Sequence, residues 1–315
     1  MNTGHQASPE DEAPEAAAPP YQPPPSAYVA YVDLLHLRPP RVWPIFVAFV
    51  LFPVAAIGLS LLVFVLALIG PLSARRDVPP EEFRRMLEEA NARPAVFLSQ
   101  FLLMALLLAG ITGSAAALSP VPGRRRLRLV RPPLTWHGWL VVLTGTLAVA
   151  YALNAGLDLL GLQDAAAASR TAGQLRSLSG PLLAVGVVLM GTAAAVVEEL
   201  FFRGYAQSRL VERWGVWRGI LWAAALNAVL QFKPPQVAAT FITAVWLGTV
   251  TERAGSVWPT LLTRSLLMTA ATFLAATRPR AGDTSSPAGL VAALAVAVAC
   301  FWYVLPRRKQ RTDAA

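Results

Sequence analysis

The sequence is organised around the stretch Ala193-Ala-Ala-Val-Val-Glu198-Glu199-Leu-Phe-Phe-Arg203-Gly204-Tyr205, in which two adjacent carboxylates and an arginine interrupt an apolar segment. A charged side chain near the middle of a bilayer costs about 2.5–3.5 kcal/mol on insertion scales, so these charges need partners or a role. Residues four apart share a face of a helix, so we expect Glu199 to pair with Arg203. Glu198 points about 100° away and needs a partner from another helix.

Composition determines the fold class. The 315 residues are 55% hydrophobic and only 14% charged, with a mean hydropathy of +0.50, which is too apolar for an ordinary soluble domain. We therefore predict an all-α, polytopic bundle of membrane helices with the lipid bilayer as its environment. The single cysteine, Cys300, excludes an internal disulfide. The net charge of +9 comes from arginines that fall between apolar segments, so membrane topology explains it and no nucleic-acid partner is expected.

Apolar segments of spanning length predict about eight transmembrane helices. The fifth and sixth are short, and only Lys233-Pro234-Pro235 separates them, so they are read as a tight hairpin. The predicted segments are 44–70, 95–118, 138–160, 180–202, 218–232, 236–251, 257–277 and 288–305.

The distribution of basic residues predicts the orientation. If the chain starts inside, the larger share of the 27 arginines and lysines falls on the cytoplasmic side, as the positive-inside rule requires. We therefore expect an integral protein of the plasma (inner) membrane with both termini in the cytoplasm. Glu198 and Glu199 then lie at the cytoplasmic end of the fourth helix. The chain continues into residues 204–217, which mix aromatic and charged side chains and predict an interfacial helix along the membrane surface.

Two further motifs accompany the charged stretch and carry a resemblance. Glu198-Glu199-x-x-x-Arg203 resembles the first motif of the CAAX protease and bacteriocin-processing (CPBP) family of intramembrane endopeptidases. The second family motif is an apolar helix that ends in histidine, and it matches Asn227-Ala-Val-Leu-Gln231 with Gln231 at the histidine position. The third, Gly-Ser-x-Trp-Pro before a helix with His-x-x-x-Asn, matches Gly255 to Met268 with Arg264 at the histidine and Met268 at the asparagine position.

The resemblance also suggests how the chain is divided. Residues 180–277 would form a CPBP-like membrane core. Residues 28–179 would form N-terminal membrane helices and loops, and residues 278–315 a last transmembrane helix with a basic cytoplasmic tail. Residues 1–27 are rich in proline and alanine and lack the basic and apolar regions of a signal peptide, so they are expected to be a disordered cytoplasmic tail.

The replaced positions change the chemistry that the resemblance implies. In such a protease a glutamate would act as general base, histidines would orient groups or bind a metal, and the asparagine would stabilise an oxyanion. Gln231 cannot exchange a proton near neutral pH, and Arg264 stays charged and would repel a divalent ion. The only histidines, His5, His36 and His137, lie outside the matching region. No metal or other cofactor is therefore expected.

The same residues predict a buried ion network. If the helices pack as in the family, Arg264 approaches Glu198, and Asn227 and Gln231 line the same cavity. Plainer readings stay open for each residue. Glu199 and Arg203 would form a simple interfacial pair, Arg264 would extend to the cytoplasmic interface, and the two amides would only join helices.

Three functions remain after this reading, and the sequence leaves open whether the protein is an enzyme. The first is a catalytically impaired relative that binds a membrane peptide, lipid or protein partner. The second is an active intramembrane endopeptidase in which Glu198 acts as base, with Glu199 and Arg203 completing a non-standard site. The third is an unrelated permease-like bundle whose buried charges line a pathway.

Overall fold

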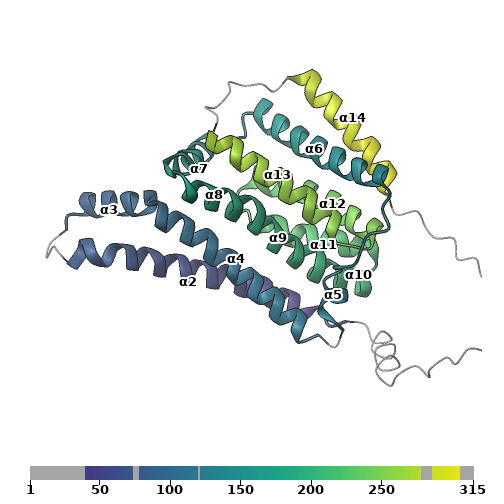
Figure 1. Cartoon of the computed structure of the whole chain (residues 1–315), viewed down its shortest axis with the longest axis horizontal. Helices are drawn as coiled ribbons and strands as arrows, with labels where there is room; N and C mark the ends of the chain where they lie inside the picture. Colours follow the sequence, from purple (N-terminus) through teal and green to yellow (C-terminus); the bar gives the residue numbers. More distant parts are fainter. Residues whose placement is uncertain (1–39, 74–77, 120, 278–285, 306–315) are drawn as a thin grey trace, which may run out of the picture. The chain divides into compact units, whose positions relative to one another are not determined.

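The computed structural model describes residues 40–73, 78–119, 121–277 and 286–305, and these residues contain only helices and their connections (Figure 1). Every described residue lies in one compact unit of the chain, which begins at residue 39. The predicted N-terminal tail 1–27 and the basic tail after residue 305 lie outside the described residues. The helices are α2 (Trp43–Ser73), α3 (Pro80–Ala92), α4 (Pro94–Ala117), α5 (Gly123–Arg126), α6 (Trp136–Leu159), α7 (Ala165–Ser177), α8 (Pro181–Val187), η1 (Val188–Ala193), α9 (Ala194–Glu199), η2 (Leu200–Gln207), α10 (Ser208–Trp214), α11 (Val216–Val229), α12 (Pro234–Ala254), α13 (Trp258–Thr277) and α14 (Pro287–Val304).

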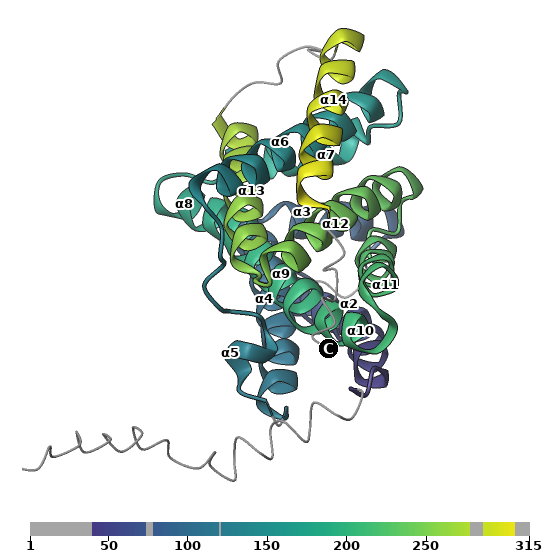
Figure 2. The same ribbon diagram turned by 90° about the vertical axis from the view of Figure 1, so that its right-hand side faces the viewer.

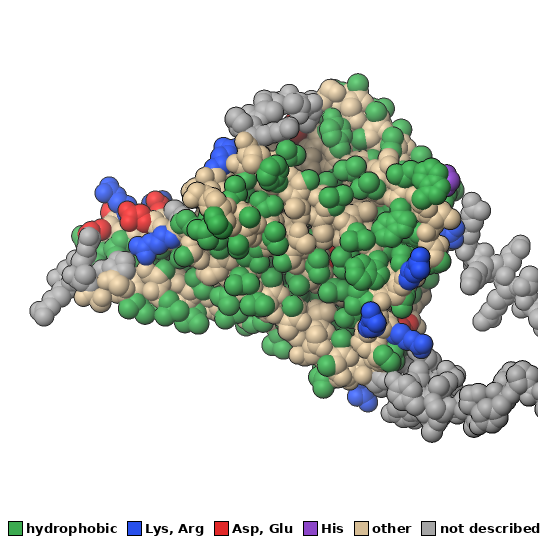
Figure 3. Space-filling view, viewed as in Figure 1, with side chains coloured by type: hydrophobic (Ala, Val, Ile, Leu, Met, Phe, Trp, Pro, Cys, Tyr) green, Lys and Arg blue, Asp and Glu red, His purple; other side chains and the backbone are tan. Residues whose placement is uncertain are grey.

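The predicted all-α membrane bundle is confirmed, and each of the eight predicted segments coincides with a helix. Among the described residues, six helical stretches are long and apolar enough to cross a membrane: Trp43–Gly70, Pro94–Ala117, Trp136–Leu159, Pro181–Trp214, Trp258–Thr277 and Pro287–Val304. The remaining two predicted segments correspond to α11 and α12. Figure 3 shows hydrophobic side chains over the middle of the visible face, whereas charged side chains gather where α3 lies and at the opposite end. This distribution fits a helical protein embedded in a bilayer.

The expected surface helix after the charged motif is wrong. Helix continues without a break from Pro181 to Trp214, and it ends only at Gly215, whose positive φ of 85° stops it. Gly204 does not end the helix because it serves a close contact: a Cβ at this position would lie 2.9 Å from the carbonyl oxygen of Leu127. The motif therefore lies inside a long helix and not at its end.

This long helix contains two π-helical segments, η1 and η2, on either side of α9. A π-helical turn bonds residue i to residue i+5, so it shifts the faces of the helix relative to a regular α-helix. Glu198 and Glu199 belong to α9, whereas Arg203 belongs to η2. The register between the acids and the arginine is therefore not that of a regular α-helix.

Helix α13 is surrounded by other helices and contacts η1, α9, α6 and α12 (Figures 1 and 2). On one flank α6 packs against α14, and elsewhere α11 packs against α12 and α2 against α4. Glycine permits the contact between η1 and α13, since a Cβ on Gly191 would lie 2.5 Å from Cα of Thr269. Next to it, the hydroxyl oxygens of Thr192 and Thr269 are hydrogen bonded at 2.8 Å. This close approach brings α13 to the acidic helix α9.

The start of α13 is held by the segment that precedes α6. The backbone N–H of Val257 donates to the carbonyl oxygen of Arg128 at 3.1 Å, and Ser256 Oγ donates to the carbonyl oxygen of Val130 at 2.6 Å. Arg128 Nη1 donates to Glu252 Oε1 at 2.5 Å. These contacts fix the end of α12 and the first turn of α13. They therefore also fix the position of the α13 side chains along the helix axis relative to α9.

We expect Gly191→Ala to lower stability by about 1–3 kcal/mol, because the added methyl group meets backbone that cannot move without displacing α13. The matched control is Gly113→Ala, where nothing lies within 4 Å of an added Cβ and where helix propensity favours alanine by about 1 kcal/mol. Thermal unfolding of the detergent-solubilised variants measures both. Equal unfolding midpoints for the two variants would contradict the close packing of η1 on α13.

Candidate functional site

The charged side chains of the motif are buried to different degrees. Glu199 is 0% exposed and Arg203 is 1% exposed, whereas the side chain of Glu198 is 33% exposed. Burial of an ionised group is costly unless it is paired and hydrogen bonded. The two acids therefore depend on a cation from another helix.

Arg264 of α13 supplies that cation. Its Nη1 donates to Glu199 Oε1 at 2.7 Å, and its Nη2 donates to Glu198 Oε2. One planar guanidinium thus binds both carboxylates, an arrangement for which arginine is well suited. The predicted pair between Glu198 and Arg264 is confirmed. The alternative in which Arg264 extends to the membrane interface is wrong, because its side chain is only 16% exposed and turns inward to the acids.

The predicted pair between Glu199 and Arg203 is present only as a long contact. Arg203 Nε lies 3.7 Å from Glu199 Oε2, and neither atom has a hydrogen-bond partner in the structure. The hydrogen bond of Glu199 goes to Arg264 instead. A physical reason is the π-helical register of η2, which alters the usual relation between residues four apart.

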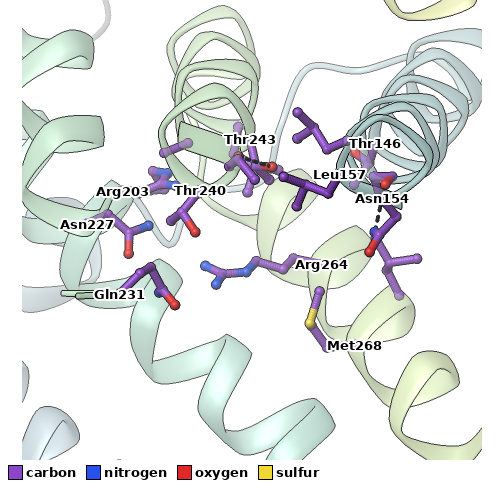
Figure 4. A pocket seen from close by; sticks show the side chains of 16 residues that line it. Thr146, Asn154, Leu157, Arg203, Asn227, Gln231, Thr240, Thr243, Arg264 and Met268 are labelled. Carbon is purple, nitrogen blue, oxygen red and sulfur yellow. Dashed lines mark hydrogen bonds between the residues drawn. The ribbon is translucent and has the colours of Figure 1, made fainter. Parts of the chain in front are cut away.

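The residues at the family positions surround one cavity of about 180 Å³ (Figure 4). Arg203, Asn227, Gln231, Arg264 and Met268 all line it. In Figure 4 the guanidinium of Arg264 extends from α13 toward the side chains of Asn227, Gln231 and Thr240. The sequence motifs on η2, α11 and α13 are therefore brought together, as the resemblance implied.

A second cavity of about 230 Å³ lies beside the first and shares Asn227 and Gln231 with it. Glu198 lines this second cavity, and most of its other lining is apolar, including Phe101, Leu108 and Phe202. Asn227 and Gln231 thus lie between the two cavities. Glu198 lines the second cavity, and Arg203 and Arg264 line the first.

Sequence reasoning missed the contributions of α6 and α12 to the first cavity. Thr146 and Asn154 come from α6, and Thr240 and Thr243 from α12. On α6 the lining positions 146, 150, 153, 154 and 157 recur at helical spacing, and on α12 so do positions 239, 240, 243, 244 and 247. This periodicity was a signal that both helices turn one face to a site, but neither helix lies within a family motif.

The donor set can bind anions and hydrogen-bonding groups better than cations. Arginine has only N–H donors and no acceptor, whereas the side-chain amides of Asn227 and Gln231 each supply a donor and an acceptor. No group of three or more His, Cys, Asp or Glu side chains that could hold a metal ion occurs within the described ranges. His137, the one histidine that the structure describes, lies against Trp136 with the rings tilted by 32° and their centroids 3.5 Å apart.

We expect Arg264→Leu to destabilise the protein by about 3–5 kcal/mol, because it removes the hydrogen-bonded cation from two carboxylates. Arg218→Leu is the matched control: Arg218 is exposed in the first turn of α11, so the change should stay within about 0.5 kcal/mol. Chemical unfolding in detergent measures the difference. Adding Glu198→Gln and Glu199→Gln to Arg264→Leu should restore much of the loss, and no recovery would argue against the ion network.

Comparison with known proteins agrees with the arrangement of these residues. Residues 180–270 match the family model of the type II CAAX prenyl endopeptidases described as Rce1-like. No curated protein and no solved structure matched the chain. The matched region runs from the start of α8 into α13 and contains the acids, the arginines and both amides. The resemblance inferred from the three motifs is therefore confirmed: residues 180–270 of this helical membrane protein are Rce1-like, of the CPBP type.

Proposed function

We propose that this CPBP-type membrane protein is a catalytically impaired relative of the CAAX-type endopeptidases that binds a membrane peptide, lipid or protein partner. The observation that carries the proposal is the position of Arg264, whose guanidinium donates hydrogen bonds to both Glu198 and Glu199. A glutamate that acts as general base must accept a proton from water. A carboxylate held by an arginine is less available for that role, and the arginine itself cannot replace a histidine.

The surrounding side chains support the same conclusion. Gln231 lines both cavities at the position of a family histidine, and an amide neither takes up nor releases a proton near neutral pH. Met268, at the asparagine position, is 39% exposed at the first cavity and offers only a weakly accepting sulfur. The site keeps side chains that can form hydrogen bonds with a ligand, but it has no histidine at the family positions that could transfer a proton. We therefore assign Asn227, Gln231, Arg264 and Met268 to binding.

The second candidate is an active endopeptidase with a non-standard site. One observation favours it: Glu198 is one-third exposed and lines the apolar second cavity. A water placed there would have Glu198 as its base, while Glu199 and Arg203 would support the helix. The permease-like alternative has less support, because the family match covers the whole region that holds the buried charges.

We propose that the protein lies in the plasma (inner) membrane with both termini in the cytoplasm, on the distribution of its arginines and lysines. A C-terminal epitope tag tests this orientation. Added protease should remove the tag in inside-out vesicles and spare it in right-side-out vesicles. Removal in right-side-out vesicles would reverse the assignment.

We expect no cleavage above background when the purified protein in detergent is incubated with a prenylated peptide or a membrane-helix peptide. The reason is the missing proton-transfer group at Gln231 and Arg264. The matched control is Glu198→Ala, which should give the same background as the wild type. Turnover by the wild type that Glu198→Ala abolishes would establish the endopeptidase instead.

The triple variant Gln231→His, Arg264→His and Met268→Asn restores the family residues. It tests whether the cavity can still support hydrolysis. Cleavage that appears only in this variant would support an impaired descendant of a protease. Substrate uptake into vesicles by the wild type would favour the permease-like alternative.

A further inference from the structure

The guanidinium of Arg203 is buried without a hydrogen-bond partner. Its side chain is 1% exposed, yet Nε, Nη1 and Nη2 all lack a partner among the described residues. A buried polar group without hydrogen bonds is destabilising, and a buried charge more so. Since Arg203 lines the first cavity, the missing acceptor is expected to come from that space.

The described part of the chain does not supply the acceptor. Glu199, the nearest acid, lies 3.7 Å from Arg203 Nε, which is beyond hydrogen-bond distance. Arg264 binds both carboxylates with its two terminal nitrogens, so the acids are held on its side. Arg203 is thus left with a single long contact to a carboxylate that is already engaged.

The cavity has unpaired N–H donors and the room for an anion. Arg203 and Arg264 both line it, and no acidic side chain from the described part of the chain does. Its volume of about 180 Å³ exceeds by far the roughly 10–15 Å³ that one water needs, so a carboxylate or phosphate group fits. Asn227 is 3% exposed, lies on the same wall as Arg203 in Figure 4, and adds an amide donor.

The cavity also reaches the surface of the membrane-spanning region. Asn154, Gln231 and Met268 line it and are exposed, whereas Arg203 and Asn227 are buried at its floor. The rim thus comes from α6, the turn that follows α11, and α13, and the buried guanidinium of Arg203 lies behind it. A ligand can place an anionic group on the floor while the rest of it remains outside.

We propose that this cavity binds an oxyanion, a carboxylate or a phosphate, with the guanidinium of Arg203 as the principal donor and the amide of Asn227 beside it. The planar fork of arginine matches both groups through two parallel hydrogen bonds. The proposal rests on the proposed binding function and names the chemistry of its ligand. The oxyanion is either the head group of an amphiphile or a free ion.

Binding is measured on the full chain in a neutral detergent and a chloride buffer, by calorimetry and by the shift of the unfolding midpoint. One arm uses dodecanoate against its uncharged methyl ester, and the other uses inorganic phosphate. We expect at least about tenfold tighter binding of dodecanoate than of the ester if the source is an amphiphile. A response to phosphate that equals or exceeds that to dodecanoate identifies a free ion.

Two variants and a matched control locate the site. Asn227→Asp keeps the size of the side chain and places a carboxylate in the cavity, so anion binding should fall at least about tenfold. Arg203→Lys keeps the charge but loses the fork, so it should weaken binding by a smaller factor. Arg209→Gln is the control: Arg209 also has a buried Nε without a partner, but it lines a different groove beside Tyr205, and its loss should leave anion binding unchanged.

The inference is overturned if the wild type responds to neither anion, or if Asn227→Asp binds the anions as tightly as the wild type. This failure is distinct from failure of the proposed function. Equal binding of dodecanoate and its methyl ester, with no response to phosphate, would leave a binding protein without an oxyanion site. Glu198-dependent proteolysis would instead refute the impaired function and leave the anion result standing.

Discussion

One guanidinium, that of Arg264, holds the core of this protein together. It donates to Glu199 at 2.7 Å and also to Glu198, and it thereby joins α13 to α9 across a low-dielectric interior. Two adjacent acids in a membrane helix would be strongly unfavourable without such a partner. The burial of the Glu199 carboxylate therefore depends on this contact.

Local backbone features make the contact possible. Gly191 lets η1 approach the backbone of α13, and the hydrogen bonds of Ser256 and Val257 to the segment before α6 fix the first turn of α13. The π-helical segments on either side of α9 change the direction in which the motif side chains point. Because of that change, Arg203 lies at the wall of a cavity and makes only a long contact with Glu199.

The replacement of histidine by arginine has two consequences that differ in kind. It removes a group that can exchange a proton, which weakens the case for hydrolysis. It also adds a permanent positive charge that binds the acids, so the other arginine, Arg203, is left without hydrogen bonds. We therefore propose that the site, which in the family would act on a substrate, holds a polar or anionic group in this chain.

The sequence alone determined the membrane helices, because apolar segments of spanning length have no other stable arrangement. It also located the motifs, whose resemblance to the family predicted the pair between Glu198 and Arg264, and the tertiary structure contains that pair. It did not determine that one long helix runs past Arg203 to Trp214, because the aromatic and charged side chains of residues 204–217 are typical of a helix on the membrane surface. Nor did it determine that Glu199 bonds to Arg264 and that α6 and α12 complete the cavity. These features arise from contacts between helices far apart in sequence and from π-helical register, which only the tertiary structure decides.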